Sequence, residues 1–239
     1  MNDCAILTGG LATRLRPLTE TIPKALLEVA GEPFLAHQLR LMVRNGIRHA
    51  VLCTGYLGEQ IRDFAGDGSR FGLRLDYSSD GPALLGTAGA IRQALPLLDQ
   101  SFFVVYGDSY LPCDWQKAGR TFQDSGRLAL MTVFRNEDLW DASNVEFGNG
   151  TILAYDKKAR TARMHHIDYG LGAFRRAAFD QIPAGVPFDL AVLYQQLLAK
   201  QQLTGFEVHQ RFYEIGSLAG LNELAAFLCS TPGEDSQAR

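Results

Sequence analysis

Short apolar runs alternate with amphipathic segments throughout the first half of the chain, and no other feature restricts the possible fold as strongly. The runs typical of buried strands cover residues 3–8, 49–54 and 101–106, with a shorter alternating run at 73–77. The segments with apolar residues at helical spacing cover residues 34–45, 57–65 and 87–95. Such alternation is typical of βαβ units, in which helices cover both faces of a mostly parallel sheet. The first half therefore predicts an α/β fold of the Rossmann-like, three-layer αβα kind.

The pattern changes at about residue 127, where short strand-like runs replace the alternation. These runs cover residues 128–134, 144–147, 151–155 and 167–174, and Gly-Asn-Gly at 148–150 predicts a hairpin turn. Helical spacing returns at 187–200 and 217–228. We therefore expect a small antiparallel subregion within one domain, because 239 residues suit a single large domain. The expected domain covers residues 1–229, with halves at about 1–126 and 127–229, and a flexible tail covers 230–239.

The composition excludes several classes of function. A net charge of -3 argues against a general nucleic-acid binder, which carries a basic face. No apolar run reaches the roughly 18 residues that a bilayer span requires, and the N-terminus lacks the basic segment of a signal peptide. We therefore expect a cytoplasmic protein that binds neither nucleic acid nor a membrane, as a monomer or a homo-oligomer. The four cysteines are scattered without zinc spacing, which favours buried, reduced thiols.

A glycine pair and several cations follow the first predicted strand. Gly9 and Gly10 allow a ligand to approach the main chain, and consecutive N–H groups in such a loop bind anions. Arg14, Arg16 and Lys24 add positive charge, and two prolines stiffen the segment. Together these features predict a cradle for a triphosphate, whereas a glycine turn with a solvated basic loop is the structural alternative. The segment contains neither the Gly-Lys-Ser/Thr of a Walker A loop nor Gly-x-Gly-x-x-Gly.

The segment GGLATRLRPLTETIPKAL, residues 9–26, resembles the signature of the sugar-phosphate nucleotidylyltransferases, also called NDP-sugar pyrophosphorylases. Shorter resemblances follow in family order over roughly residues 3–228. They are YLGEQI (56–61), LGTAGAI (85–91), YGDSY (106–110), YDKK (155–158), DYGLGAF (168–174) and FYEIGSLAGL (212–221). The resemblance implies that an oxygen of a sugar 1-phosphate attacks the α-phosphorus of a nucleoside triphosphate. Pyrophosphate would leave with the help of Mg²⁺.

The resemblance also implies roles for the polar residues of these motifs. Arg14 would hold the triphosphate, Lys24 would bridge the α-phosphate and the sugar phosphate, and Asp108 would bind Mg²⁺. Glu214 would be the second carboxylate on the metal, although many family members have Asp there. The expected nucleotide-binding residues are Leu7, Gly9, Gly10, Thr13, Arg14, Gly86 and Thr87. The structural alternatives are a turn or helix cap for Asp108 and a surface carboxylate for Glu214.

The predicted sugar-phosphate site departs from the family pattern. Its expected residues are Lys157, Asp156, Gly170 and Asn144. Asp156 stands where the family often has Glu, and Asp168-Tyr169-Gly170 lacks the family's usual Asn before the glycine. Both departures concern the sugar rather than the reaction. The alternatives are a solvated charge for Lys157 and plain strand structure around Asn144.

The sequence leaves the substrates open. Resemblance to small single-domain members favours GTP with heptose or mannose 1-phosphate. Cytidylyl, uridylyl or thymidylyl transfer to another sugar, or to a non-sugar phosphate, is an alternative. A catalytically silent paralogue that binds a nucleotide sugar is another, but such paralogues usually lose the Arg, Lys or acidic residues that this chain retains. A glycosyltransferase of related fold would usually show Asp-x-Asp at the metal, where this chain has the single aspartate Asp108.

Overall fold

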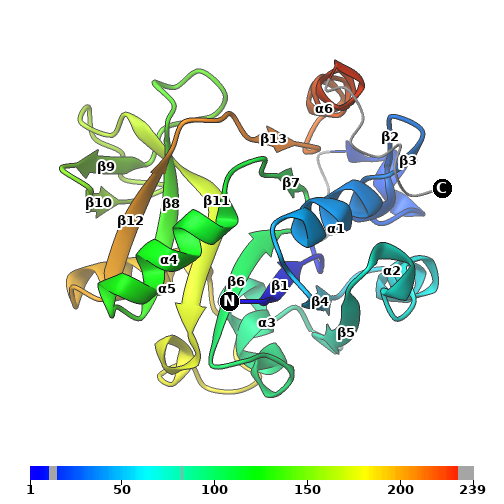
Figure 1. Cartoon of the computed structure of the whole chain (residues 1–239), viewed down its shortest axis with the longest axis horizontal. Coiled ribbons are helices and arrows are strands. Elements are labelled where there is room, and N and C mark those ends of the chain that lie inside the picture. Colours follow the sequence, from blue (N-terminus) through cyan, green and yellow to red (C-terminus); the bar gives the residue numbers. More distant parts are fainter. Residues whose placement is uncertain (11–14, 82, 231–239) are drawn as a thin grey trace.

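The computed structural model describes residues 1–10, 15–81 and 83–230 of the 239-residue chain (Figure 1). Within these ranges the main sheet comprises nine strands. They are β1 (Asp3–Leu7), β4 (His49–Thr54), β5 (Arg74–Ser79), β6 (Ser101–Tyr106), β8 (Ala129–Arg135), β9 (Val145–Gly148), β10 (Thr151–Tyr155), β11 (His166–Arg175) and β12 (Leu203–Val208). Two small strand pairs lie outside this sheet: β2 (Glu28–Val29) with β3 (Glu32–Pro33), and β7 (Ser109–Tyr110) with β13 (Tyr213–Glu214).

Helices connect these strands and cover the sheet. The α-helices are α1 (Phe34–Arg44), α2 (Gly58–Ala65), α3 (Gly86–Ala94), α4 (Trp115–Ser125), α5 (Leu190–Ala199) and α6 (Leu218–Ser230). The short 3-10 helices are η2 (Leu18–Glu20), η3 (Lys24–Leu26), η4 (Ser69–Phe71), η5 (Leu95–Leu97) and η6 (Arg176–Phe179). No helix within the described ranges is long and apolar enough to cross a membrane.

The sheet changes its direction of winding at β1. Its main strand order is β10-β9-β11-β6-β1-β4-β5, and β8 and β12 are attached through β11. β1 pairs in parallel with β4 on one side and with β6 on the other, and β4 pairs in parallel with β5. The carboxyl ends of β1, β4 and β6 therefore meet at a topological switch point, the place where open α/β sheets bind ligands.

Antiparallel pairing enters the sheet through β11. This strand runs antiparallel to both β6 and β8, while β12 is parallel to β8. β9 and β10 form an antiparallel hairpin. Asn149 and Gly150 turn it with φ values of 52° and 73°, as the Gly-Asn-Gly motif predicts. The predicted α/β fold, with a mostly parallel first half and an antiparallel subregion, is confirmed.

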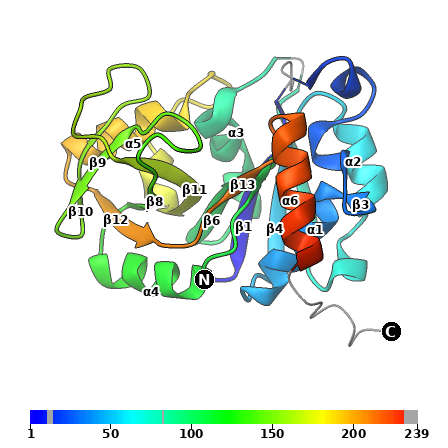
Figure 2. The same ribbon diagram turned by 90° about the horizontal axis from the view of Figure 1, so that it is seen from above.

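Successive residues of the central strands face opposite layers. Ile6 and Leu52 belong to a core formed with α1, α2 and α4, whereas Ala5 and Val51 belong to a core formed with α3 and α5. Figure 2 shows α4 on one side of the sheet and α3 and α5 on the other. Because both faces are covered, the parallel strands carry continuous apolar runs rather than alternating ones.

Several elements differ from the sequence-based expectation. The periodicity does not predict α4 or β12. α5 begins at Leu190 rather than at residue 187, because Oδ1 of Asp189 accepts the N–H of Ala191 and caps the helix. α6 continues to Ser230, so this residue belongs to a helix and not to the expected tail. The rest of that tail, 231–239, lies outside the described residues.

The cysteines are free thiols in the part of the chain that the structure describes. Cys4, Cys53 and Cys113 are buried, as expected for reduced cysteines in an apolar core. Cys229 is exposed on α6, so the expectation of burial is wrong for this residue.

Candidate active site

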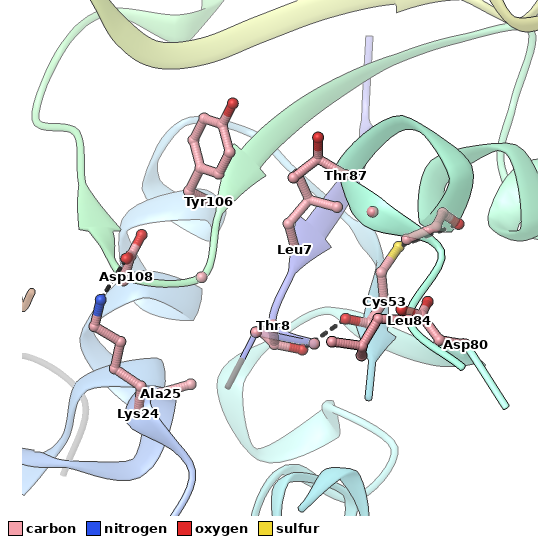
Figure 3. Close-up of a pocket in the computed structure, with 15 residues that line it drawn as sticks. Leu7, Thr8, Lys24, Ala25, Cys53, Asp80, Leu84, Thr87, Tyr106 and Asp108 are labelled. Carbon is pink, nitrogen blue, oxygen red and sulfur yellow. Dashed lines mark hydrogen bonds and ion pairs between the residues drawn. The ribbon is translucent and has the colours of Figure 1, made fainter. Parts of the chain in front are cut away.

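A cavity of about 280 Å³ lies at the switch point of the sheet (Figure 3). It is bordered by the carboxyl ends of β1, β4 and β6 and by the N-terminus of α3. Its lining residues are Leu7, Thr8, Gly9, Gly10, Lys24, Ala25, Cys53, Asp80, Leu84, Gly86, Thr87, Ala90, Tyr106, Gly107 and Asp108. The structure thus brings together most of the predicted catalytic and nucleotide-binding residues. The exceptions are Thr13 and Arg14, which lie outside the described residues.

The strand ends approach each other closely on the cavity floor. The N–H of Gly107 donates to the carbonyl of Leu7 at 2.9 Å, and the N–H of Thr8 donates to the carbonyl of Cys53 at 3.0 Å. A Cβ at position 107 would lie 2.6 Å from Cγ2 of Thr8 and 2.8 Å from the carbonyl oxygen of Leu7. Glycine is therefore required at this position by the approach of β1 to the end of β6.

Lys24 and Asp108 form an ion pair at one end of the cavity. Nζ of Lys24 lies 2.6 Å from Oδ2 of Asp108, and the two side chains are 21% and 36% exposed. Lys24 begins η3, and Asp108 follows directly after β6. Both charged groups can therefore be reached by a ligand in the cavity. This end concentrates a mobile ammonium and a carboxylate, which are groups that bind phosphate and a divalent cation.

A buried glutamine holds the turn that carries Asp108. Nε2 of Gln38, on α1, donates to the carbonyl oxygens of Tyr106 and Ser109 at 2.8 and 2.9 Å. Gln38 is 1% exposed, so this contact replaces hydrogen bonds to water. The position of the Asp108 carboxylate therefore depends on a side chain from a different layer of the fold.

The pairing of β13 with β7 brings Glu214 next to the same turn. Glu214 stands opposite Ser109 in this pair, and the N–H of Ile215 donates to the carbonyl of Asp108 at 3.0 Å. The described residues contain no preformed cluster of three or more metal-ligating side chains. Mg²⁺ is commonly held by one or two carboxylates together with substrate phosphates. The residues present fit a site of that kind, with Asp108 and the exposed Glu214 as its carboxylates.

The end of the cavity opposite Lys24 is apolar except for the carboxylate of Asp80, as far as the described residues go. Cys53 and Leu84 stand beside Asp80 in Figure 3. Burial raises the pKa of the Cys53 thiol to about 12, so this thiol stays neutral. Burial also raises the pKa of Asp80, although the N–H of Leu85 donates to its Oδ2 at 3.1 Å and lowers it. A flat, weakly polar group such as a nucleobase fits this end.

The second half of the chain packs against the start of α3, which borders the cavity. The carbonyl oxygen of Phe188 accepts the N–H groups of Ala88 and Gly89 at 2.9 and 3.2 Å, at the start of α3. Oγ1 of Thr87 donates to Oδ1 of Asp189 at 3.2 Å and accepts the N–H of residue 190 at 2.7 Å. The hydroxyl of Thr87 therefore joins α3 to α5, and the residue also lines the cavity.

Glycine is required at positions 86 and 89 by the close approach of residues 186–188. Gly86 has a φ of +67°, and a Cβ there would lie 2.8 Å from the carbonyl oxygen of Phe188. A Cβ at Gly89 would lie 2.9 Å from the carbonyl oxygen of Val186. Residues 186–188 therefore occupy the space beside both glycines. Gly86 still lines the cavity.

A second group of polar residues surrounds Asp168, beside the wall that Tyr106 forms. The hydroxyl of Tyr155 donates to Oδ2 of Asp168 at 3.5 Å, and the N–H of Gly170 donates to Oδ1 at 3.1 Å. Gly170 has a φ of +99°, and a Cβ there would lie 3.7 Å from the Tyr106 ring. Nζ of Lys157 lies 5.7 Å from the centroid of the same ring. Tyr106 thus separates the cavity from the Asp168 cluster by one side chain.

Charge and burial oppose each other within this cluster. Burial raises the pKa of Asp168, while the ammonium of Lys157 lowers it. Burial also raises the pKa of the Tyr106 phenol well above its ordinary value, and Asp168 adds to that effect. The phenol therefore keeps its proton. A partly accessible carboxylate beside phenols and an ammonium suits a ligand rich in hydroxyl groups.

Asn144 and Asp156 have structural contacts in this region. Oδ1 of Asn144 accepts the N–H of Asp168 at 3.0 Å, and its carbonyl oxygen accepts the N–H of Asp156 at 3.0 Å. Oδ1 of Asp156 accepts two N–H groups of its own turn at 2.7 and 2.8 Å, and Oδ2 accepts from Gln195 at 3.2 Å. The structure therefore brings Asn144, Gly170 and Lys157 around Asp168 but turns Asp156 towards its own loop and α5.

Sequence reasoning overlooked three residues of the site. Asp80 is the first residue after β5, so the rule that ligands meet strand carboxyl ends could have indicated it. Tyr106 is the last residue of β6 and could have been found in the same way. Gln38 lies on the apolar face of a predicted helix, and a buried amide there is a signal for a hydrogen-bonding partner in another loop.

The fold and the site together define an α/β protein with a ligand cavity at the sheet's switch point and a lysine–aspartate pair at its charged end. Residues 4–158 match the model of a family described as nucleotidyl transferase. The N-acetylmuramate alpha-1-phosphate uridylyltransferase of Neisseria meningitidis serogroup B is 34% identical over 236 residues, which cover 92% of this chain and 96% of that protein. The chain therefore belongs to the nucleotidyl transferase family and is a nucleotidyltransferase. The predicted family resemblance is confirmed.

Other relatives carry different base and sugar names. The mannose-1-phosphate guanylyltransferase catalytic subunit beta of Danio rerio is 29% identical over 217 residues, 88% of this chain. The chain spans 60% of that relative's length. The structure of HddC from Yersinia pseudotuberculosis, complexed with GMP-PN, superposes with a TM-score of 0.79 at 21% identity. That match covers 95% of this chain and 100% of HddC, and it supports the fold alone.

Proposed function

We propose that this enzyme transfers a nucleotidyl group from a nucleoside triphosphate to a sugar 1-phosphate and releases pyrophosphate. The observation that carries this proposal is the contact of 2.6 Å between Lys24 and Asp108 at the charged end of the cavity. The other end has the size and polarity for a base, and the Asp168 cluster lies behind Tyr106. The apolar end of the cavity would therefore hold a base, the Lys24–Asp108 end would hold phosphates, and the Asp168 cluster would hold a hydroxyl-rich group.

The proposed chemistry requires positioning and charge neutralisation more than proton transfer. The attacking phosphate oxygen is already an anion, so no base has to activate it. The main obstacle is the repulsion between two phosphate groups, which fixed cations reduce in a cavity shielded from water. Lys24 would contact both the α-phosphate and the sugar phosphate, as the family resemblance implies. Arg14 would hold the triphosphate, as the family resemblance implies.

Asp108 and Glu214 would hold Mg²⁺, which supplies additional positive charge for the attack and for the departing pyrophosphate. Gln38 keeps the turn of Asp108 in position through its two hydrogen bonds. The ammonium of Lys24 orients the same carboxylate from the opposite side. These contacts fix the charged groups before substrates bind, which lowers the cost of reorganisation during the reaction.

Lys157 would contact the phosphate of the sugar substrate from the other side of Tyr106. Its Nζ lies 5.7 Å from the Tyr106 ring centroid, and its charge lowers the pKa of Asp168. Residues 1–229 would act as one catalytic unit, divided at about residue 126 into nucleotide and sugar halves. The pairing of β11 with both β6 and β8 supports this arrangement. The enzyme would work in the cytoplasm, where nucleoside triphosphates are supplied.

A matrix of substrates tests the proposal. ATP, GTP, CTP, UTP and dTTP are each combined with several sugar 1-phosphates and Mg²⁺, and pyrophosphate release is followed. Release with at least one pair, lost on removal of Mg²⁺ by chelation, is the expected result. Binding of a nucleotide sugar without release from any pair would instead identify a catalytically silent paralogue. The variant Lys117→Ala, which removes an exposed lysine on α4, controls for general effects of lost charge.

A further inference from the structure

We propose that Asp168 selects the sugar by accepting hydrogen bonds from its hydroxyl groups and by excluding sugar 1-phosphates that carry a carboxylate. This inference rests on the proposed function and specifies the substrate class for the same site: neutral, polyhydroxylated sugars. The resemblance leads one to expect an asparagine here, so the carboxylate is a property of this chain.

The main chain around Asp168 is distorted in a way that presents its side chain at the end of the sheet. The register of β11 against β8 shifts between Asp168 and Gly172. Gly170 has a φ of +99° inside this irregular segment. Further along, Leu171 pairs with Val105 of β6, which places Asp168 beyond the carboxyl end of that strand. Within the described residues, Asp168 therefore pairs with Val133 of β8 but has no partner on β6, and it lies on the Tyr106 side of the cavity.

Three contacts hold Asp168 in place. Oδ1 of Asn144 accepts its N–H at 3.0 Å, while its own Oδ1 accepts the N–H of Gly170 at 3.1 Å. The hydroxyl of Tyr155 lies 3.5 Å from Oδ2, a long hydrogen bond. An ionised carboxylate can accept about four hydrogen bonds. Within the described residues this side chain uses two, so it retains acceptor capacity for a ligand.

The surroundings favour hydroxyl donors over further acids. An ionised carboxylate offers only acceptors, and each hydroxyl of a sugar can donate to it. Lys157 is the cation that acts on Asp168, and in the proposed function it is engaged by the sugar phosphate. A second carboxylate, on the substrate, would then lie near Asp168 without Lys157 to neutralise it. Unpaired like charges in a partly buried site are a strong means of rejecting a wrong substrate.

The inference gives this chain a sugar preference different from the one that the name of its Neisseria relative states. That relative is named for N-acetylmuramate 1-phosphate, a sugar with a carboxylate on its lactyl group. Asp168 predicts the opposite preference here. Glucose, mannose or heptose 1-phosphate present hydroxyl groups alone around the ring and meet the requirement of an acceptor-only side chain.

The test compares neutral and acidic sugars with the wild-type enzyme and Asp168→Asn. The sugars are α-D-mannose and α-D-glucose 1-phosphates, their single-deoxy analogues, glucuronate 1-phosphate and N-acetylmuramate α-1-phosphate. The wild type is expected to prefer the neutral sugars by about a hundredfold or more in kcat/KM. Asp168→Asn keeps an acceptor for Gly170 and should reduce this preference at least about tenfold. The change should appear in the KM for the sugar phosphate, with the KM for the triphosphate unchanged.

Deoxy analogues locate the hydroxyl that Asp168 binds. One analogue should lose about tenfold or more in kcat/KM with the wild type and little with Asp168→Asn, which is the coupling expected of a direct contact. The control Asp180→Asn removes an exposed aspartate and should behave as the wild type. Melting temperatures show whether each variant is folded.

The results separate failure of this inference from failure of the proposed function. Preference of the wild type for an acidic sugar, or equal ratios in the wild type and Asp168→Asn, overturns the selection by Asp168 while turnover still supports the transfer reaction. If no pair releases pyrophosphate, calorimetric binding of the same sugar 1-phosphates tests Asp168 separately. Tighter binding of the neutral sugars, reduced in Asp168→Asn, would then support the inference without the reaction.

Discussion

Nζ of Lys24 lies 2.6 Å from Oδ2 of Asp108, although 84 positions separate the two residues in the sequence. One residue comes from the glycine-containing segment after β1, and the other follows β6, the neighbouring strand. The parallel pairing of β1 with β6 therefore creates the contact. Two motifs that are separate in the sequence become the two charges of a single site.

Removal of either charge should abolish most of the activity. We expect Lys24→Ala and Asp108→Asn each to lower turnover by about a hundredfold or more, because each removes electrostatic stabilisation of the transition state. Pyrophosphate release under saturating substrates measures this effect. Asp63→Asn, on the exposed face of α2, is the matched control for the aspartate and should retain activity. Full activity in both Lys24→Ala and Asp108→Asn would contradict the site as described.

Glu214 should influence the requirement for metal more than the fold. Glu214→Gln keeps the side-chain length but removes the charge that would face Mg²⁺. We expect the Mg²⁺ concentration for half-maximal activity to rise about tenfold, as for loss of one of two carboxylate ligands. Titration of activity with MgCl₂ measures the shift, with Glu59→Gln on α2 as the control. An unchanged titration would make Glu214 an ordinary surface residue.

Gln38 should affect both stability and catalysis, although it does not line the cavity. Gln38→Leu leaves two buried carbonyl oxygens without their donor, at a cost of about 1–3 kcal/mol in the free energy of unfolding. Turnover should fall because the Asp108 turn loses its support. Urea denaturation and kinetics measure the two effects. Gln123→Leu, at an exposed position of α4, should change neither, and a Gln38 variant with normal turnover would exclude a positioning role.

Two glycines with different surroundings provide a paired test of the cavity floor. An added Cβ at Gly107 would lie 2.8 Å from the carbonyl oxygen of Leu7, so Gly107→Ala has to displace main chain at a cost of about 1–3 kcal/mol. A Cβ at Gly148 would touch Cδ1 of Leu153 at 3.7 Å, an ordinary contact. We expect Gly107→Ala to unfold at lower urea concentration and to raise the KM for the triphosphate. Gly148→Ala should do neither.

The burial of Asp168 should make stability depend on pH. Because burial raises its pKa in the folded chain, the folded state binds this proton more readily than the unfolded state does. Ionisation of Asp168 therefore costs stability above the folded pKa, and this cost disappears as the pH falls towards the ordinary aspartate value of about 4. Asp168→Asn should be more stable than the wild type at neutral pH, with the difference shrinking at lower pH. Urea denaturation between about pH 3 and pH 8 measures the difference; a difference that stays constant down to the ordinary aspartate pKa would contradict this origin.

The sequence predicted the charged end of the site well and its surroundings poorly. Lys24 and Asp108 stand in motifs that follow apolar strands. Because parallel strands bring their carboxyl ends to the same edge of a sheet, the sequence alone indicates that these motifs lie together. The roles of Gln38 and Tyr106 at the site depend on which loop packs against which face of a helix. Hydrophobic periodicity does not specify that contact. Asp168 was identified as a departure from the family pattern, but its burial and its relation to Lys157 follow from the bulge in β11, which the pattern does not show.

The fold likewise has elements that the sequence predicted and elements that it did not. β1, β4 and β6 are buried on both faces and read as continuous apolar runs, so their prediction was correct. α4 was overlooked because its buried side rests on four residues, Trp115, Ala118, Gly119 and Phe122, two of them small. β12 includes Gly205, a residue that weakens a strand pattern, yet its pairing with β8 forms one edge of the sheet.

The carbonyl oxygen of Phe188 covers the start of α3, about a hundred positions away in the sequence. The conformation at the start of α3 consequently depends on a segment from the second half of the chain. An exchange of residues 85–91 with a relative, intended to change the nucleotide used, would leave 186–190 mismatched against the new segment. A change of nucleotide choice in this enzyme would require both segments to be transplanted together, and an isolated fragment ending near residue 126 would lack the segment that supports the start of α3.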